Sequence, residues 1–191
     1  MKLSKKDVAG IVATLSKDAT RPGMCQAAYC ARQEVVFATD GHRLAVVRQD
    51  LARPPKGGWP ELTWSTDTIY PIPRAALESA AKSAKKNDVV ELRAHPTGVD
   101  VVSGRVTIAV WGGDAAVFPP MLRALDAAKA GKKGTPIIGV NADYLADAIT
   151  LASDATSSQV IMRFGPSELD PMRVESPDGR IVVLIMPVRR D

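Results

Sequence analysis

Three stretches of this 191-residue sequence follow one pattern: DGHRLAVV at residues 40–47, SGRVTIAV at residues 103–110 and DGRIVVLI at residues 178–185. In each stretch a Gly follows a small polar residue, and an apolar run comes shortly after it. Gly accepts the positive φ that a tight turn requires, so each stretch predicts a turn that leads into a β-strand. Three such copies in one chain indicate an internal structural repeat.

An apolar stripe with helical spacing lies upstream of each turn. The three stripes are Val8, Ile11, Val12 and Leu15; Ala76, Leu77, Ala80, Ala81 and Ala84; and Tyr144, Leu145, Ala148, Ile149 and Ala152. We expect Ser4 and Asn141 to cap the first and third helices, and Pro73 to be the first residue of the second. β-rich stretches at residues 24–38, 89–102 and 160–174 separate each helix from its turn. The predicted unit is therefore a strand, a helix and an antiparallel meander.

These units predict an α+β fold whose helices cover one face of the sheets. We expect residues 1–113 to form one complete domain of two units, with both helices on a continuous sheet. Residues 114–134 are expected to be a linker with a short helix at 121–130, and residues 135–191 a single half-domain. Because this third unit has no partner unit within the chain, we expect it to leave a strand edge open to another chain.

The composition excludes several classes of protein. Apolar residues make up 46% and charged residues 24% of the sequence, which is typical of a globular protein. No apolar run approaches a membrane span, and Met1 leads into no signal-peptide core, so we expect a cytoplasmic location. Two Cys and two His are too few and too scattered for a zinc site, so we expect no metal, no cofactor and no disulfide framework. No nucleophile motif, carboxylate pair or phosphate-binding loop indicates an enzyme.

Four motifs occur in the order that they have in a known family. They are Thr20-Arg21-Pro22, FATDGHRLAV at residues 37–46, Phe118-Pro119 and MPVR at residues 186–189. Together they resemble the bacterial replicative sliding clamp, the β subunit of DNA polymerase III. Family members carry three two-unit domains per chain, so this shorter chain resembles the middle domain joined to the second half of the last one. The resemblance implies a DNA-clamp fold.

The resemblance also implies a pocket that binds short peptide motifs of partner proteins. Carried over residue by residue, its members would be Met24, Thr39, Gly41, His42, Arg43, Leu44, Pro119, Arg123, Leu184, Met186, Val188 and Arg189. The apolar members would form a cleft in which flexible Met side chains adapt to different peptides, and the Arg side chains would meet a peptide carboxylate or carbonyl. The alternative for each apolar residue is a place in the ordinary core.

A ring of this family encircles duplex DNA with its helices. The net charge is +4, and residues 1–113 hold 16 Lys and Arg against 11 Asp and Glu, whereas residues 114–191 hold 9 against 10. The candidate phosphate contacts are Lys5, Lys6, Lys17, Arg74, Lys82, Lys85 and Lys86, with Lys132 and Lys133 in the linker. The alternative is a solvated helix face. Asp143, Asp147 and Asp154 would repel phosphate if the third helix faced DNA.

Two functions therefore compete. The first is a clamp-like homo-oligomer that surrounds duplex DNA and tethers a DNA polymerase or repair proteins. If twelve units close a ring, three units per chain predict four chains, with each third unit either paired with another third unit or packed end-on against the next chain. The second is an adaptor or decoy that binds clamp-binding motifs of replication proteins without encircling DNA.

Overall fold

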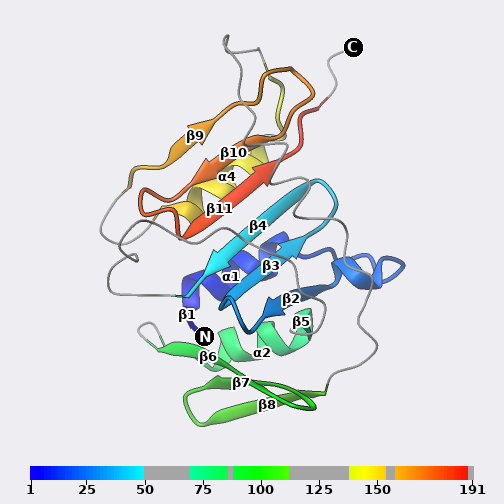
Figure 1. The fold of residues 1–191 in the computed structure, drawn as a ribbon, viewed down its shortest axis with the longest axis vertical. Helices are drawn as coiled ribbons and strands as arrows, with labels where there is room; N and C mark the ends of the chain where they lie inside the picture. The colour runs from blue at the N-terminus through cyan, green and yellow to red at the C-terminus, as the bar shows by residue number, and fades with distance from the viewer. Residues whose placement is uncertain (50–68, 86–87, 112–137, 154–157, 189–191) are drawn as a thin grey trace.

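The computed structural model describes residues 1–49, 69–85, 88–111, 138–153 and 158–188 (Figure 1). Three units follow one another. The first comprises β1 (Lys2–Ser4), α1 (Lys5–Thr14), the short 3-10 helix η1 (Pro22–Met24), β2 (Gln26–Cys30), β3 (Val35–Thr39) and β4 (Arg43–Arg48). The second comprises β5 (Ile69–Pro73), α2 (Arg74–Ser83), β6 (Val89–His95), β7 (Gly98–Ser103) and β8 (Val106–Trp111). The third contains α4 (Ala142–Ala152), β9 (Ile161–Arg163), β10 (Met172–Glu175) and β11 (Ile181–Ile185). The predicted repeat and α+β class are confirmed, while the helix expected at 121–130 lies outside the described residues.

The helices begin where local chemistry predicts. The Ser4 side chain accepts a hydrogen bond from the backbone N–H of Asp7, and the Asp7 side chain accepts one from the backbone N–H of Ser4. This reciprocal pair is a capping box, which satisfies two backbone donors at the start of α1. Asn141 caps α4 in a similar way. Pro73 is the residue just before α2 rather than its first helical residue.

The three predicted turns are also confirmed. Gly41, Gly104 and Gly179 have φ values of 92°, 58° and 69°. These values lie in the left-handed region, where a side chain with a Cβ atom is strained. Each turn joins the last two strands of its unit, so it sets the start of β4, β8 or β11.

The strands form two sheets rather than the continuous sheet expected for the first two units. One sheet has the order β1-β6-β7-β8, and the other has the order β5-β2-β3-β4-β11-β10-β9. β1 belongs to the first unit but pairs with β6 of the second, with Leu3 opposite Val90. In return, β5 of the second unit pairs with β2 of the first, with Ile72 opposite Ala27. The two units therefore exchange their first strands, a choice that local periodicity cannot specify.

The third unit is joined to the first. β11 pairs with β4 in antiparallel register, with Leu184 opposite Leu44, and extends that sheet to seven strands. α4 packs against α1, where the Leu151 side chain fills the space beside Gly10. The expectation that this unit has no partner within the chain is thus wrong for the β11 edge. Its other edge, β9, pairs only with β10 in the part of the chain that the structure describes.

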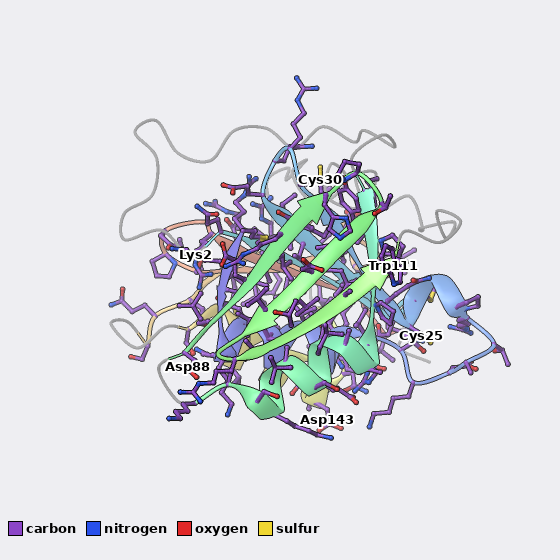
Figure 2. The ribbon with its side chains drawn as sticks, turned by 90° about the horizontal axis from the view of Figure 1, so that it is seen from below. Lys2, Cys25, Cys30, Asp88, Trp111 and Asp143 are labelled. Carbon is purple, nitrogen blue, oxygen red and sulfur yellow. The ribbon has the colours of Figure 1, made fainter. Side chains whose placement is uncertain are left out.

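The main core lies between the helices and the two sheets. Leu3, Val8, Ile11, Leu77 and Val183 are among its buried members. A second apolar cluster lies on the opposite face of the seven-stranded sheet and comprises Ala28, Cys30, Val35, Phe37, Leu44, Val46, Val182 and Leu184. Figure 2 looks onto the four-stranded sheet, with Trp111 at the end of its outer strand β8. Within the described residues, no helix is long and apolar enough to cross a membrane.

Candidate functional site

The predicted peptide-binding residues gather around the turn between β3 and β4. The Thr39 hydroxyl donates to the Arg43 carbonyl at 2.7 Å and accepts from the Gly41 N–H at 3.1 Å. The Asp40 carboxylate accepts from the backbone N–H groups of His42 and Arg43, both at 3.0 Å. Side chains thus satisfy the backbone of this turn, which holds it in one conformation.

The chain after β11 lies against this turn. The Met186 N–H donates to the His42 carbonyl at 2.8 Å, and the Val188 N–H donates to the Gly139 carbonyl at 2.8 Å. Met186 and Val188 are 42% and 53% exposed. Both therefore offer apolar surface beside the turn.

Leu44 and Leu184 occupy a different environment from the tail. They face each other across β4 and β11 and are only 5% and 2% exposed. Both belong to the second apolar cluster. The structure therefore places them in packed surroundings below the surface, next to the exposed tail.

Met24 reaches the same turn from the end of η1. Its Sδ and Cε atoms would lie 3.4 Å from a Cβ atom at Gly41. The structure thus brings together eight of the predicted residues: Met24, Thr39, Gly41, His42, Arg43, Leu44, Leu184 and Met186. Val188 lies next to them on Gly139. Pro119, Arg123 and Arg189 lie outside the described residues.

Arg43 has an internal role that the sequence did not suggest. Its guanidinium donates to the carboxylates of Asp40 and Asp147 at 3.1 and 2.6 Å, and to the Ala13 carbonyl at 2.7 Å. Its Cζ atom also lies 4.5 Å from the centre of the Tyr144 ring. Strand alternation places Arg43 on the helix face of the sheet and Leu44 on the opposite face. Arg43 therefore ties the turn to α1 and α4.

A cavity of about 640 Å³ opens beside the turn. Its lining residues are Ala13, Leu15, Ser16, Lys17, Asp18, Arg21, Asp40, His42, Arg43, Arg74, Tyr144 and Asp147. Hydrogen bonds from the Thr20 hydroxyl and N–H lower the pKa of Asp18, which favours its charged form. The His42 and Tyr144 rings stack with their centres 6.2 Å apart. Arg21 and Tyr144 were not predicted, although Arg21 stands in one of the quoted motifs.

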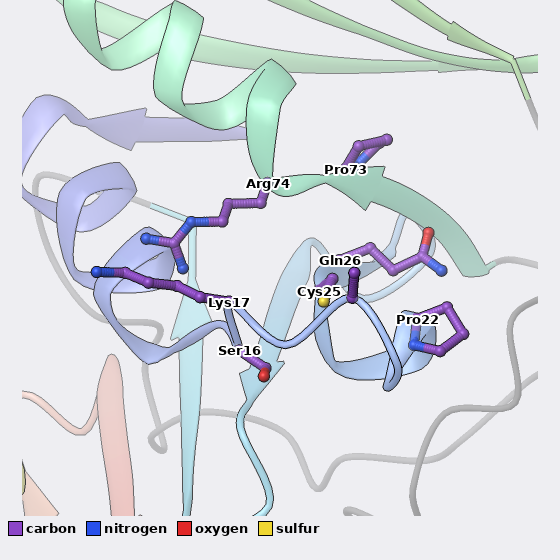
Figure 3. A pocket seen from close by; sticks show the side chains of 8 residues that line it. Ser16, Lys17, Pro22, Cys25, Gln26, Pro73 and Arg74 are labelled. Atoms are coloured by element: carbon purple, nitrogen blue, oxygen red, sulfur yellow. The ribbon is translucent and has the colours of Figure 1, made fainter.

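A second cavity of about 340 Å³ lies at the end of α1 and the start of α2 (Figure 3). Lys17 and Arg74 line both cavities, so they stand between them. Pro22, Cys25 and Pro73 complete much of its wall. In Figure 3 the Lys17 and Arg74 side chains extend in the same direction.

Three of the predicted DNA-contacting side chains bind the ends of neighbouring helices. Lys5 donates to the Ala84 carbonyl at 2.7 Å, at the end of α2. Lys6 donates to the Ser153 carbonyl at the end of α4. Arg74 donates to the Leu15 carbonyl at 2.7 Å, at the end of α1. A cation is favourable at each of these positions because the C-terminal end of a helix carries partial negative charge.

The other candidate cations divide into two groups. Lys17, Lys82 and Lys85 are exposed, whereas Lys86, Lys132 and Lys133 lie outside the described residues. Asp143 and Asp147 are exposed on α4, and Asp147 holds Arg43. No group of acidic, Cys and His side chains suited to a metal ion occurs among the described residues.

Comparison with solved structures identifies the fold. No family model and no curated protein matches the sequence. A putative DNA polymerase III β subunit from Eubacterium rectale matches with a TM-score of 0.70 and 11% identity, over 100% of this chain and 65% of that one. The DNA polymerase III β subunit of Pseudomonas aeruginosa matches with a TM-score of 0.68 and 14% identity, over 99% of this chain and 66% of that one.

A third solved structure, pol III β from Caulobacter crescentus, matches with a TM-score of 0.62 and 19% identity, over 100% of this chain and 66% of that one. The chain thus spans about two thirds of the length of the clamp chains that it matches. The predicted resemblance and the predicted clamp fold are confirmed. This chain has the fold of the bacterial DNA polymerase III β sliding clamp in a shortened form.

Proposed function

We propose that this protein is a shortened sliding clamp that assembles around duplex DNA and tethers replication or repair proteins. The observation that carries the proposal is the likeness of the whole chain to clamp structures. The helices support it as well, because α1 packs between α2 and α4. A continuous helix layer on one side of the sheets suits a surface that faces DNA without reading its bases.

Several cations of this layer lie where α1 begins and α2 ends. Lys5 and Lys6 lie there and bind carbonyls at the ends of α2 and α4. The exposed Lys82 and Lys85 add further positive charge near the end of α2. Contacts of this kind bind phosphates and release counterions, so affinity falls with salt. We therefore expect weak, sequence-independent and salt-sensitive binding to duplex DNA.

The DNA experiment compares single charge removals on the two faces of the molecule. Lys82→Ala and Lys85→Ala should each lower the slope of log affinity against log salt by up to about one, because each removes one phosphate contact. Arg93→Ala is the matched control. Arg93 lies on the face of β6 opposite to the buried Leu92, away from the helix layer. An equal effect of all three variants, or base-specific binding, would contradict the proposal.

The tethering part of the proposal rests on the turn and the tail beside it. Exposed Met186 and Val188, with Met24 against Gly41, provide adaptable apolar surface next to the fixed backbone of the turn. We expect a peptide with a Gln followed by two apolar anchors to bind with roughly micromolar affinity, since two partly buried side chains offset the cost of ordering the peptide.

The peptide experiment uses exposed positions, because a charge at buried Leu44 would disturb the fold itself. Met186→Ala, and removal of residues 186–191, should abolish or strongly weaken peptide binding while the thermal transition stays near that of the unchanged protein. Leu169→Ala is the matched control, since Leu169 is an exposed apolar residue outside this region. Peptide binding that survives the tail deletion would refute the pocket.

Assembly completes the proposal. A clamp-like ring of twelve units would need four copies of this three-unit chain, provided that the curvature is unchanged. Most homo-oligomers of soluble proteins have closed point-group symmetry. Measurement of the molecular mass in solution at tens of micromolar protein tests it, and a species of only 20 kDa would contradict it.

The second candidate function is an adaptor or decoy that binds clamp-binding motifs without encircling DNA. Exposed Asp143 on α4 favours it, because negative charge in the helix layer opposes phosphate. A monomer that binds the peptide but not DNA would support this function over the first.

A further inference from the structure

The edge strand β9 differs from its counterparts in the other units. β2 and β6, the first meander strands of those units, each pair with two strands. In the described part of the chain β9 has a single neighbour, β10, and Figure 1 shows it at the margin of the upper sheet. Met162 lies opposite Val174, a member of the main core, yet it is 40% exposed. The third unit therefore has an acceptor edge that nothing described covers.

The same unit also has the strand that such an edge accepts. In the first two units the residues directly before the helix form β1 and β5, which pair with the sister unit. In the third unit, residues 138–140 stand directly before the Asn141 cap of α4. Their only described pairing is the isolated bridge from Gly139 to Val188. The third unit thus has both a donor strand, residues 138–140, and an acceptor edge, β9. Among the described residues, neither takes part in a strand exchange like that of the first two units.

The flank of α4 supports the same conclusion. α4 meets α1 through Leu151 at Gly10, and its Asp147 binds Arg43 of β4, which also donates to the Ala13 carbonyl in α1. At 100° per residue, Leu145 and Ile149 lie about 120° and 160° around α4 from Leu151, on the side of the helix that faces away from α1. Both are only half-buried. In the first two units, the equivalent helix surfaces are covered because α1 and α2 pack against each other.

We propose that the third units of two copies of this chain complete each other. Residues 138–140 of each copy pair with β9 of the other, and the two α4 helices pack side by side about a two-fold axis. The partner is a second copy because one unit carries both the donor strand and the acceptor edge, and a two-fold interface needs such self-complementarity. The inference rests on the homo-oligomeric assembly in the proposed function, but it needs neither DNA nor peptide.

This junction also leads to a closed assembly. A pair joined in this way ends on the two β8 strands, which are the last strands of their units, like β4 and β11. β4 and β11 already pair with each other in antiparallel register within the chain. The same kind of contact between β8 strands would join two pairs into a ring of four chains.

The experiment is thiol cross-linking of the full chain without DNA or peptide. Cys25 and Cys30 are first replaced by Ser and Ala, and Val140→Cys is combined with Met162→Cys. Leu3 and Ile72, the residues one before the caps of α1 and α2, are both buried against the helices, so Val140 should face the helix layer as Met162 does. Neighbouring or diagonal positions on adjacent strands lie roughly 5 to 8 Å apart, within reach of a short bis-maleimide. We expect a covalent species of twice the chain mass.

Two controls distinguish the alternatives. Val140→Cys combined with Val106→Cys on β8 should give little covalent dimer, and dominant cross-linking there would show end-on packing and overturn the proposal. Met162→Glu should at least halve the oligomeric fraction in sedimentation, whereas Leu169→Glu, at an exposed apolar position outside β9, should not. An unchanged mass for Met162→Glu would also overturn it. If the dimer persists while DNA and peptide binding are absent, the proposed function fails and this inference stands.

Discussion

The chain contains two junctions between units, and they are built by different means. The first and second units meet by exchanging β1 and β5, so apolar side chains such as Leu3 and Ile72 carry the contact. The first and third units meet along β4 and β11 and are also joined by ion pairs between Arg43 and Asp147 and between Arg180 and Asp7. The cations that link the first two units, Lys5 and Arg74, bind backbone carbonyls there instead. The second kind of junction depends more on single polar residues, because a buried charge that loses its partner is costly.

The main charged tie links residues at opposite ends of the sequence. The Arg180 guanidinium donates to both carboxylate oxygens of Asp7, at 2.9 and 3.1 Å. Asp7 is 1% exposed and also belongs to the capping box with Ser4. One carboxylate thus starts α1 and holds the third unit.

Loss of this tie should have the largest effect on the junction. Arg180→Met leaves the Asp7 carboxylate buried without its cation, so we expect the free energy of unfolding to fall by about 3–5 kcal/mol. Urea denaturation measures it. Arg93→Met is the control, because its pair with Glu91 lies at the surface and should change the stability little. Adding Asp7→Asn to Arg180→Met should restore part of the loss; a further full loss would contradict this explanation.

A smaller effect is expected where α1 and α4 touch. A Cβ atom at Gly10 would lie 2.2 Å from Cδ1 of Leu151, so Gly10→Ala forces the Leu151 side chain to move. Crowding of this kind costs about 1–3 kcal/mol, and the better helix propensity of Ala offsets about 1 kcal/mol. We expect a net loss of about 1 kcal/mol. In the Leu151→Ala background Gly10→Ala should instead stabilise the protein, and equal losses in both backgrounds would rule out the contact.

At the junction between the first and second units, the smallest expected effect is a loss of stability at high pH that comes from Tyr29. Burial, followed by the charge of Glu34, raises the pKa of Tyr29 to about 12, and Tyr29 pairs with Tyr70 across β2 and β5. Tyr29 in the unfolded chain ionises near pH 10, so this residue's contribution to stability is complete below pH 10 and is lost as the pH rises toward 12. Tyr29→Phe should flatten the decline measured by urea denaturation between pH 9 and 11. Parallel curves for both proteins would contradict the prediction.

Features that depend on near neighbours in the chain could be predicted from the sequence. Asp7 caps α1 from three residues beyond Ser4, and Gly41 needs only its own positive φ to turn the chain. The resemblance also identified residues that are far apart in sequence yet meet at one turn, such as Met24 and Met186. The pairing of the strands could not be predicted in this way, because it joins residues that are far apart in the sequence, such as Leu3 and Val90.

The sequence by itself thus determined the repeat, the caps of α1 and α4, the glycine turns and several of the residues that meet at the β3–β4 turn, since each follows from short-range sterics, hydrogen bonding or a motif. Only the tertiary structure decided which strands pair, that Arg43 is held by Asp147, and that Lys5, Lys6 and Arg74 bind helix ends. The physical reason is that strand edges and cationic side chains have many acceptable partners. Packing of the whole chain selects among them, because a buried polar group must find its partner wherever the fold brings one.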